Sequence, residues 1–289
     1  MSARVTIHSI KINIIIYNQN LKAMKKLSIL AVAFAAMAFA ACGGNKGSQN
    51  VEEKDSLKSF EQEQIEASIK MHFDSLASEL GKLKQLPVVM KDGAISLTDA
   101  EKQVKPDYLL DLTAADEAMT LSEKYRVLSA IEVDKEVVKL YDMPVDEYDK
   151  AIAKLAADIN DPSFKAIDDA GNIYEATSTL YDAMNENGRI NYFWQIVATS
   201  LVEQLYVTSQ NTDKFIAAFN DDAAANVTFR IILIQDALNR LTEYDPELAP
   251  VAKAIEPLTV LNAVTVDELK AQMVEAKEKI AEARASLLK

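Results

Sequence analysis

Residues 189–209 read RINYFWQIVATSLVEQLYVTS, and this stretch predicts a helix at the centre of a helical protein. Its apolar side chains recur at helical spacing along one face, and further apolar side chains extend that face almost around the helix. After Arg189, the only charged residue in it is Glu203. A helix that is apolar on most sides usually lies inside its domain, so we expect the rest of the chain to pack around this one.

A second stretch, residues 222–244, has a similar pattern and reads DAAANVTFRIILIQDALNRLTEY. We expect these two helices to pack together, with their few charged residues partly buried. Because desolvating a charge costs several kcal/mol, such residues must be paired or hydrogen-bonded. A structural ion pair is the simpler interpretation, and a polar ligand pocket is the alternative. The candidate pocket residues are Tyr192, Trp194, Gln195, Glu203, Arg230 and Asp236.

In the remainder of the chain, the placement of glycine and proline is typical of an all-α protein. Glycine is rare after residue 50, prolines fall between the apolar periodic segments, and alternating strand patterns are absent. Thr98, Thr120 and Thr265 are each followed three residues later by glutamate, which is the spacing of a helix capping box. We therefore predict a multi-helix bundle of roughly eight to ten helices over residues 51–289, with a possible subdivision near 161–172.

Composition excludes several classes of site. The chain carries 31 basic and 44 acidic residues and a net charge of −13, and none of the acidic residues precedes Cys42. Such acidity repels phosphate backbones, so we expect no nucleic-acid partner. One cysteine, and a single histidine (His72) after Cys42, are too few for a disulfide, a thiolate zinc site or a multi-histidine site. We expect no metal site and no cofactor, whereas a hydrolase that uses two carboxylates is compatible with these counts.

The stretch from Met24 to Cys42, MKKLSILAVAFAAMAFAAC, predicts where the protein resides. Two lysines precede an apolar run, Leu27–Ala41, whose only polar member is Ser28. The run is shorter than the ~20 residues that span a bilayer, and it fits a removable secretory signal. Residues 1–23 lie upstream of this pattern. We interpret them as a mis-annotated extension; the alternative is that they form a genuine one.

Small residues directly before Cys42 make this stretch resemble a bacterial lipoprotein signal, although Phe39 stands where leucine is usual. The resemblance implies that residues 24–41 are removed and that Cys42 is lipidated. Residues 42–50, CGGNKGSQN, then form a flexible lipidated tether to the helical domain. The membrane is therefore an expected partner of the chain, through the Cys42 anchor.

Two Asp-Ser-Leu triplets, at residues 55–57 and 74–76, resemble the O-glycosylation motif of Bacteroides-type bacteria, which makes Ser56 and Ser75 candidate acceptors. In those bacteria an acidic cluster just after the lipidated cysteine directs surface export. Residues 43–50 contain no acidic residue, and Glu52 and Glu53 come late. We therefore expect an outer-membrane anchor with the domain on the periplasmic face rather than on the cell surface.

The sequence contains no phosphate-binding glycine loop, no HExxH and no GxSxG motif. The hypothesis that fits best is a lipid-anchored, non-catalytic helical bundle that acts as a binding or interaction module, with an envelope protein as a possible partner. The alternative is a carboxylate-based hydrolase that acts on envelope glycan.

Overall fold

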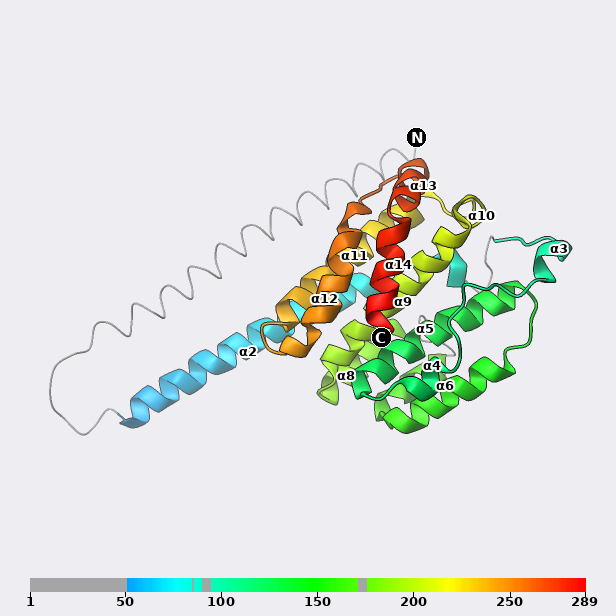
Figure 1. The fold of residues 1–289 in the computed structure, drawn as a ribbon. Coiled ribbons are helices and arrows are strands. Elements are labelled where there is room, and N and C mark those ends of the chain that lie inside the picture. The colour runs from blue at the N-terminus through cyan, green and yellow to red at the C-terminus, as the bar shows by residue number, and fades with distance from the viewer. Residues whose placement is uncertain (1–50, 85, 90–94, 171–175) are drawn as a thin grey trace. The chain divides into compact units, whose positions relative to one another are not determined.

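The computed structural model describes residues 51–84, 86–89, 95–170 and 176–289 (Figure 1). Within these ranges the chain forms helices and turns and contains no strand, which confirms the prediction of an all-α multi-helix bundle. The α-helices are α2 (Val51–Lys82), α3 (Asp99–Lys102), α4 (Ala114–Glu117), α5 (Leu121–Leu140), α6 (Asp146–Ile159), α7 (Lys165–Ala170), α8 (Thr177–Glu186), α9 (Ile190–Gln210), α10 (Thr212–Ile216), α11 (Asp221–Leu241), α12 (Ala249–Ile255), α13 (Val266–Glu275) and α14 (Lys277–Leu287).

Short 3-10 helices fill several connections: η1 (Pro87–Val89), η2 (Pro162–Phe164), η3 (Pro246–Leu248) and η4 (Glu256–Val260). The described α-helices outnumber the eight to ten that the sequence predicts, because one-turn helices such as α3 and α4 add to the long ones. The C-terminal helical segment is also divided in two, since α13 ends at Glu275 and α14 begins at Lys277.

The chain divides into two compact units, one ending at Ser75 and one comprising Leu76–Lys289. In the first unit, the described residues form the long N-terminal part of α2. The predicted extension (1–23), signal (24–41) and tether (42–50) lie outside the described residues. The possible subdivision near 161–172 stays a prediction, since residues 171–175 also lie outside them.

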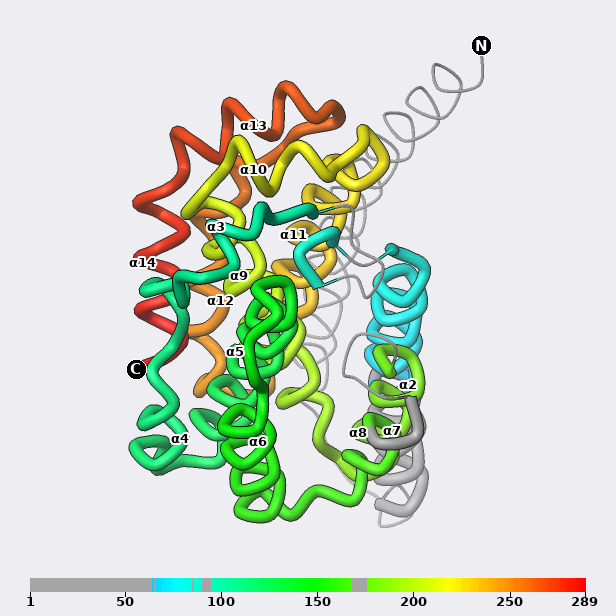
Figure 2. The backbone as a smooth tube through the Cα atoms, turned by 90° about the vertical axis from the view of Figure 1, so that its right-hand side faces the viewer, coloured from blue at the N-terminus to red at the C-terminus, as the bar shows by residue number. Residues whose placement is uncertain are grey.

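The core of the Leu76–Lys289 unit is organised around α9, as the sequence predicts. Most of α9 is buried, including Trp194, and it packs most extensively on α5 (Figure 2). The helices α14, α11 and α8 cover further sides of α9, so the expected contact between α9 and α11 is present. An apolar surface around nearly the whole circumference of α9 requires neighbours on several sides, and this arrangement supplies them.

Local sequence signals set most helix ends. Thr98 and Thr120 form complete capping boxes with Glu101 and Glu123. Thr265 accepts a hydrogen bond from the Glu268 amide, but the Glu268 carboxylate accepts one from Val264 N–H instead of closing the box. Gly188 has φ 67°, a left-handed conformation that favours glycine, and it lies between α8 and α9.

Candidate functional site

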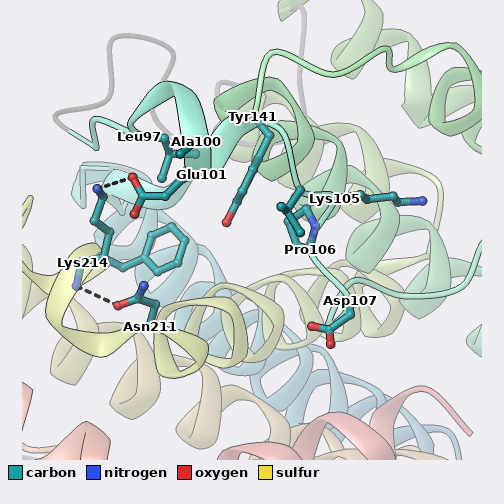
Figure 3. Close-up of a pocket in the computed structure, with 11 residues that line it drawn as sticks. Leu97, Ala100, Glu101, Lys105, Pro106, Asp107, Tyr141, Asn211 and Lys214 are labelled. Carbon is teal, nitrogen blue, oxygen red and sulfur yellow. Dashed lines mark hydrogen bonds and ion pairs between the residues drawn. The ribbon is translucent and has the colours of Figure 1, made fainter.

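A pocket of about 540 Å³ lies on the Leu76–Lys289 unit, where α3, the segment after it, the end of α5 and α10 meet (Figure 3). Its volume falls within the usual range of small-molecule sites. The lining residues are Leu97, Ala100, Glu101, Val104, Lys105, Pro106, Asp107, Tyr141, Asn211, Lys214 and Phe215.

Helix capping places the charged pair on one side of this pocket. Thr98 N–H donates to Glu101 Oε2 at 2.6 Å, and Glu101 N–H donates back to Thr98 Oγ1 at 3.3 Å. The same carboxylate accepts from Lys214 Nζ at 2.9 Å, while Asn211 Oδ1 accepts from the Lys214 amide and so caps α10. These bonds join α3 to α10, two helices that lie far apart in the sequence.

The electrostatics of the pocket favour an ionised carboxylate. The Lys214 hydrogen bond, followed by the bonds from Thr98, lowers the pKa of Glu101 to about 2. Lys105 and Asp107 lie on the opposite side, with Tyr141 between the two sides (Figure 3). The pocket therefore presents charges of both signs at its rim.

The apolar residues that line the pocket differ in how deeply they are buried. Phe215 is 1% exposed and belongs to the core, whereas Val104 is 68% exposed. Apolar side chains next to a few polar groups are typical of sites that bind a ligand with an apolar body and charged or polar groups. The arrangement is thus suited to recognition.

Two hydrogen bonds hold the wall formed by residues 105–107. Tyr108 OH lies 3.2 Å from Tyr141 OH, and burial raises the pKa of Tyr108. Further along the same segment, Leu110 N–H donates to Asp134 Oδ2 at 2.6 Å. The pocket wall is therefore attached to α5 at Asp134 and to the residue that follows α5, Tyr141.

Asp134 belongs to a buried charged cluster that joins three helices. Glu203 on α9 accepts two hydrogen bonds from Arg284 on α14, at 2.7 and 2.8 Å. Arg284 also lies over the ring of Tyr206, 4.2 Å from its centroid. Asp134 and Glu203 are fully buried, and Arg284 is 15% exposed. Burial and then the Glu203 charge raise the pKa of Asp134 well above its usual value, against the opposing effects of the Leu110 hydrogen bond and the Arg284 charge.

A second buried network joins the start of α5 to η2 and α9. Tyr125 OH donates to Asp161 Oδ2, and Arg189 donates to Tyr125 OH at 2.7 Å. Asp161 also accepts from Ser163 N–H at 2.8 Å and lies 3.6 Å from the Arg189 guanidinium. Tyr192 stacks on Tyr125 with ring centroids 4.6 Å apart. These contacts stabilise the position of η2, and their polar groups are already occupied.

The six residues that the sequence analysis named as a candidate pocket have different partners. Glu203 pairs with Arg284, whereas Arg230 donates to the carbonyl oxygens of Leu83 and Lys84 at the end of α2. The other four are Tyr192, which stacks on Tyr125; Trp194, which is fully buried; Gln195, which accepts from Arg126; and Asp236, which is half-buried on α11. None of the six lines the 540 Å³ pocket.

The modification sites are only partly described. Cys42 lies outside the described residues, and the side chain of Ser56 does as well. Ser75 is exposed near the end of the first unit. Exposure is compatible with glycosylation of Ser75 but does not test it.

Gln195 does not line the smaller hollow of about 190 Å³, but it bonds to two residues that do: it accepts from Arg126 and donates to Ser122 Oγ at 3.4 Å. The hollow is lined by Thr120, Ser122, Arg126, Glu247, Pro250, Val251 and Ser286. Arg126 also donates to the Leu287 carbonyl oxygen at 2.6 Å. This arginine therefore attaches the end of α14 to α5.

Sequence reasoning missed Asp134 and Arg284, although a signal for each is present. Asp134 lies on the same helical stripe as Ile131 and Val138, and Arg284 lies on the stripe of Ile280 and Leu287. A charged residue on an apolar stripe predicts a buried partner. Glu101 and Lys214 carry no comparable signal, because single surface charges are common.

Comparison of the chain with protein-family models, with curated proteins and with solved structures gives no match. Among the described residues, no helix combines the length and apolar character that a bilayer crossing requires. In the same part of the chain, no group of three or more His, Cys, Asp and Glu side chains is placed to hold a metal ion.

Proposed function

We propose that this protein is a lipid-anchored, non-catalytic binding module of the bacterial outer membrane, held through Cys42 and facing the periplasm. The anchor rests on the Met24–Cys42 pattern and its resemblance to lipoprotein signals. The binding role rests on the pocket between α3 and α10. An envelope protein or a small ligand with an apolar body and charged groups is the expected partner.

The observation that carries the binding role is that the charged pair at the pocket is partly exposed, whereas the charged pair in the core is buried. In the pocket, Glu101 and Lys214 pair at the surface, where their side chains remain 37% and 27% exposed and can exchange partners with a ligand. Surface pairs of this kind contribute little to stability, so exchanging their partners costs little. The pocket is thus available for recognition without disturbance of the core.

A glycan hydrolase remains the alternative, and the site favours it less. Such enzymes need an acid with a raised pKa beside a second carboxylate, with both reaching the substrate. Asp134 has a raised pKa, but it is buried in the core, where a substrate does not reach it. In the pocket, the pKa of Glu101 is lowered, which is opposite to the requirement for a general acid.

The anchor is tested by metabolic labelling with a fatty-acid analogue and by fractionation of envelopes. We expect the label in the wild-type chain at the outer membrane and its loss in Cys42→Ala. Protease added to intact cells then distinguishes the two faces, because a periplasmic domain is protected. Equal labelling of Cys42→Ala would overturn the proposed anchor.

The binding role is tested by co-purification of the acylated protein from crosslinked envelopes. The pocket variant is Tyr141→Ala with Lys214→Ala, and the matched control is Lys150→Ala, which removes an exposed lysine paired with Glu147 on α6. We expect a stoichiometric partner to co-purify with the wild type and with the control, but not with the pocket variant. Recovery of the same partner by the pocket variant would show that another surface binds it.

A further inference from the structure

The smaller hollow of about 190 Å³ is lined by a cation and an anion that do not pair with each other. Arg126 and Glu247 both line it. In the part of the chain that the structure describes, neither of these side chains forms an ion pair with any residue. Because the two opposite charges share one hollow without contact, a single ligand that carries both charges can bind to both of them.

Two neutral acceptors fix the position of Arg126 and leave its charge uncompensated. Its Nε–H donates to the Leu287 carbonyl oxygen at 2.6 Å, and its Nη1 donates to Gln195 Oε1 at 2.8 Å. A guanidinium has five N–H donors, and these bonds use two of them. Glu123 acts on this cation only at longer range, because its carboxylate caps the start of α5. Arg126 is therefore a pre-positioned cation that retains donors for a carboxylate.

The other polar residues of the hollow carry hydroxyl groups: Thr120, Ser122 and Ser286. Ser122 Oγ accepts from Gln195, which leaves its O–H as a donor for a ligand. Pro250 and Val251 supply the apolar part of the lining. The volume is below the usual range of sites for drug-sized molecules, so the ligand must be small.

We propose that this hollow is a second binding site, for a small zwitterion such as a free α-amino acid, whose carboxylate binds Arg126 and whose ammonium binds Glu247. The site shares no lining residue with the pocket between α3 and α10, so it adds to the proposed function. The acidity of the chain and the Glu247 carboxylate both act against a plain anion. A plain cation would leave Arg126 unmatched, whereas a zwitterion matches both charges.

The site joins three segments that lie far apart in the sequence: the start of α5, η3 with α12, and the end of α14. A ligand that binds only the folded chain raises its unfolding temperature. The test is thermal unfolding of the full-length protein in detergent with each of the common α-amino acids at millimolar concentration, followed by calorimetric titration. We expect at least one amino acid to raise the unfolding temperature saturably. Acetate and methylammonium, which each carry one of the two charges, should not do so at the same concentration.

Glu247→Gln is the decisive variant, because Glu247 is exposed and its loss does not disturb the core. We expect it to bind the amino acid about ten- to a hundredfold more weakly, since a hydrogen bond between charged groups is lost. Glu243→Gln, which removes an exposed carboxylate outside the hollow, is the matched control and should bind like the wild type.

Three results would overturn the inference: no α-amino acid raises the unfolding temperature, acetate binds as well as the amino acid does, or Glu247→Gln binds with wild-type affinity. The pocket variant Tyr141→Ala with Lys214→Ala should retain amino-acid binding, because neither residue lines this hollow. Failure of this inference and failure of the proposed function are therefore seen in different experiments.

Discussion

The pocket and the core each contain a charged cluster, and the two differ in how they are built. Residues 101–110 connect them, from Glu101 at the pocket to Leu110, which donates to Asp134 in the core. At the pocket, Glu101 and Lys214 are partly exposed and belong to short helices. In the core, Glu203 and Arg284 are joined by two hydrogen bonds between longer helices, with a buried acid beside them. A buried charge cannot lose its partner without a large cost, whereas a surface charge exchanges its partner for water. The core cluster therefore stabilises the fold, whereas the charges at the pocket can exchange partners at little cost.

The largest expected effect comes from disrupting the core cluster. Arg284→Met leaves the charge of Glu203 buried without its cation, and we expect a loss of about 3–5 kcal/mol in the free energy of unfolding. Urea unfolding followed by circular dichroism measures it. The double variant Glu203→Gln with Arg284→Met should be less destabilised, because it removes the buried charge as well. Nearly wild-type stability in Arg284→Met would show that Glu203 is not ionised.

The next effect concerns the buried Asp134 carboxyl group, which accepts a hydrogen bond from Leu110 N–H. Asp134→Ala leaves Leu110 N–H without its acceptor, and we expect a loss of about 1–3 kcal/mol. Asp134→Asn should lose less stability, because its carbonyl oxygen still accepts from Leu110 N–H. Unfolding curves of the two variants in the same buffer test this difference, and equal losses would contradict it.

The pH dependence of stability tests whether the pKa of Asp134 is raised on folding. Because the pKa of Asp134 is raised in the folded state, folding retains a proton that the unfolded chain releases. The contribution of Asp134 to stability is therefore full below the pKa that this carboxyl group has in the unfolded chain. It declines by about 1.4 kcal/mol per pH unit as the pH rises towards the pKa of Asp134 in the folded state. The difference in unfolding free energy between Asp134→Asn and wild type should grow over this range. A constant difference would show that the pKa of Asp134 is not raised on folding.

A smaller loss is expected in the second buried network. Tyr125→Phe removes the hydroxyl that joins Asp161 and Arg189, but these two remain close enough to pair directly, 3.6 Å apart. We expect a loss of about 1–2 kcal/mol, measured by urea unfolding. Tyr192→Phe keeps the stacked ring and serves as the control. A loss as large as that of Arg284→Met would show that the two buried networks are equally critical.

The smallest change in stability is expected at the pocket. Lys214→Ala removes the partner of Glu101, and because the pair is exposed we expect an unchanged melting temperature. The pKa of Glu101 should rise from about 2 towards the ordinary carboxyl value, since Lys214 is the main cause of its lowering. Side-chain carboxyl titration by NMR measures this shift. A clear loss of stability would mean that the pocket pair is structural, like the core cluster.

Much of the helical architecture could be predicted because its signals are local. Thr98 and Thr120 cap helices through bonds to residues three positions away, and Gly188 adopts the left-handed conformation that ends α8. The burial of Glu203 follows from the apolar stripe on which it lies. Its partner could not be predicted, because Arg284 is 81 residues away and Arg230 was an equally reasonable candidate.

The all-α class, the central position of α9 and the Met24–Cys42 pattern that predicts a lipid anchor can all be read from the amino-acid sequence. These features depend on hydrophobic periodicity, capping and composition, which act over a few residues. The packed helices were needed to establish that Arg284 pairs with Glu203, that Arg230 binds the end of α2, and that α3 and α10 enclose a pocket. Side-chain partners and hollows depend on how helices are rotated and packed against each other, and no local rule encodes that geometry.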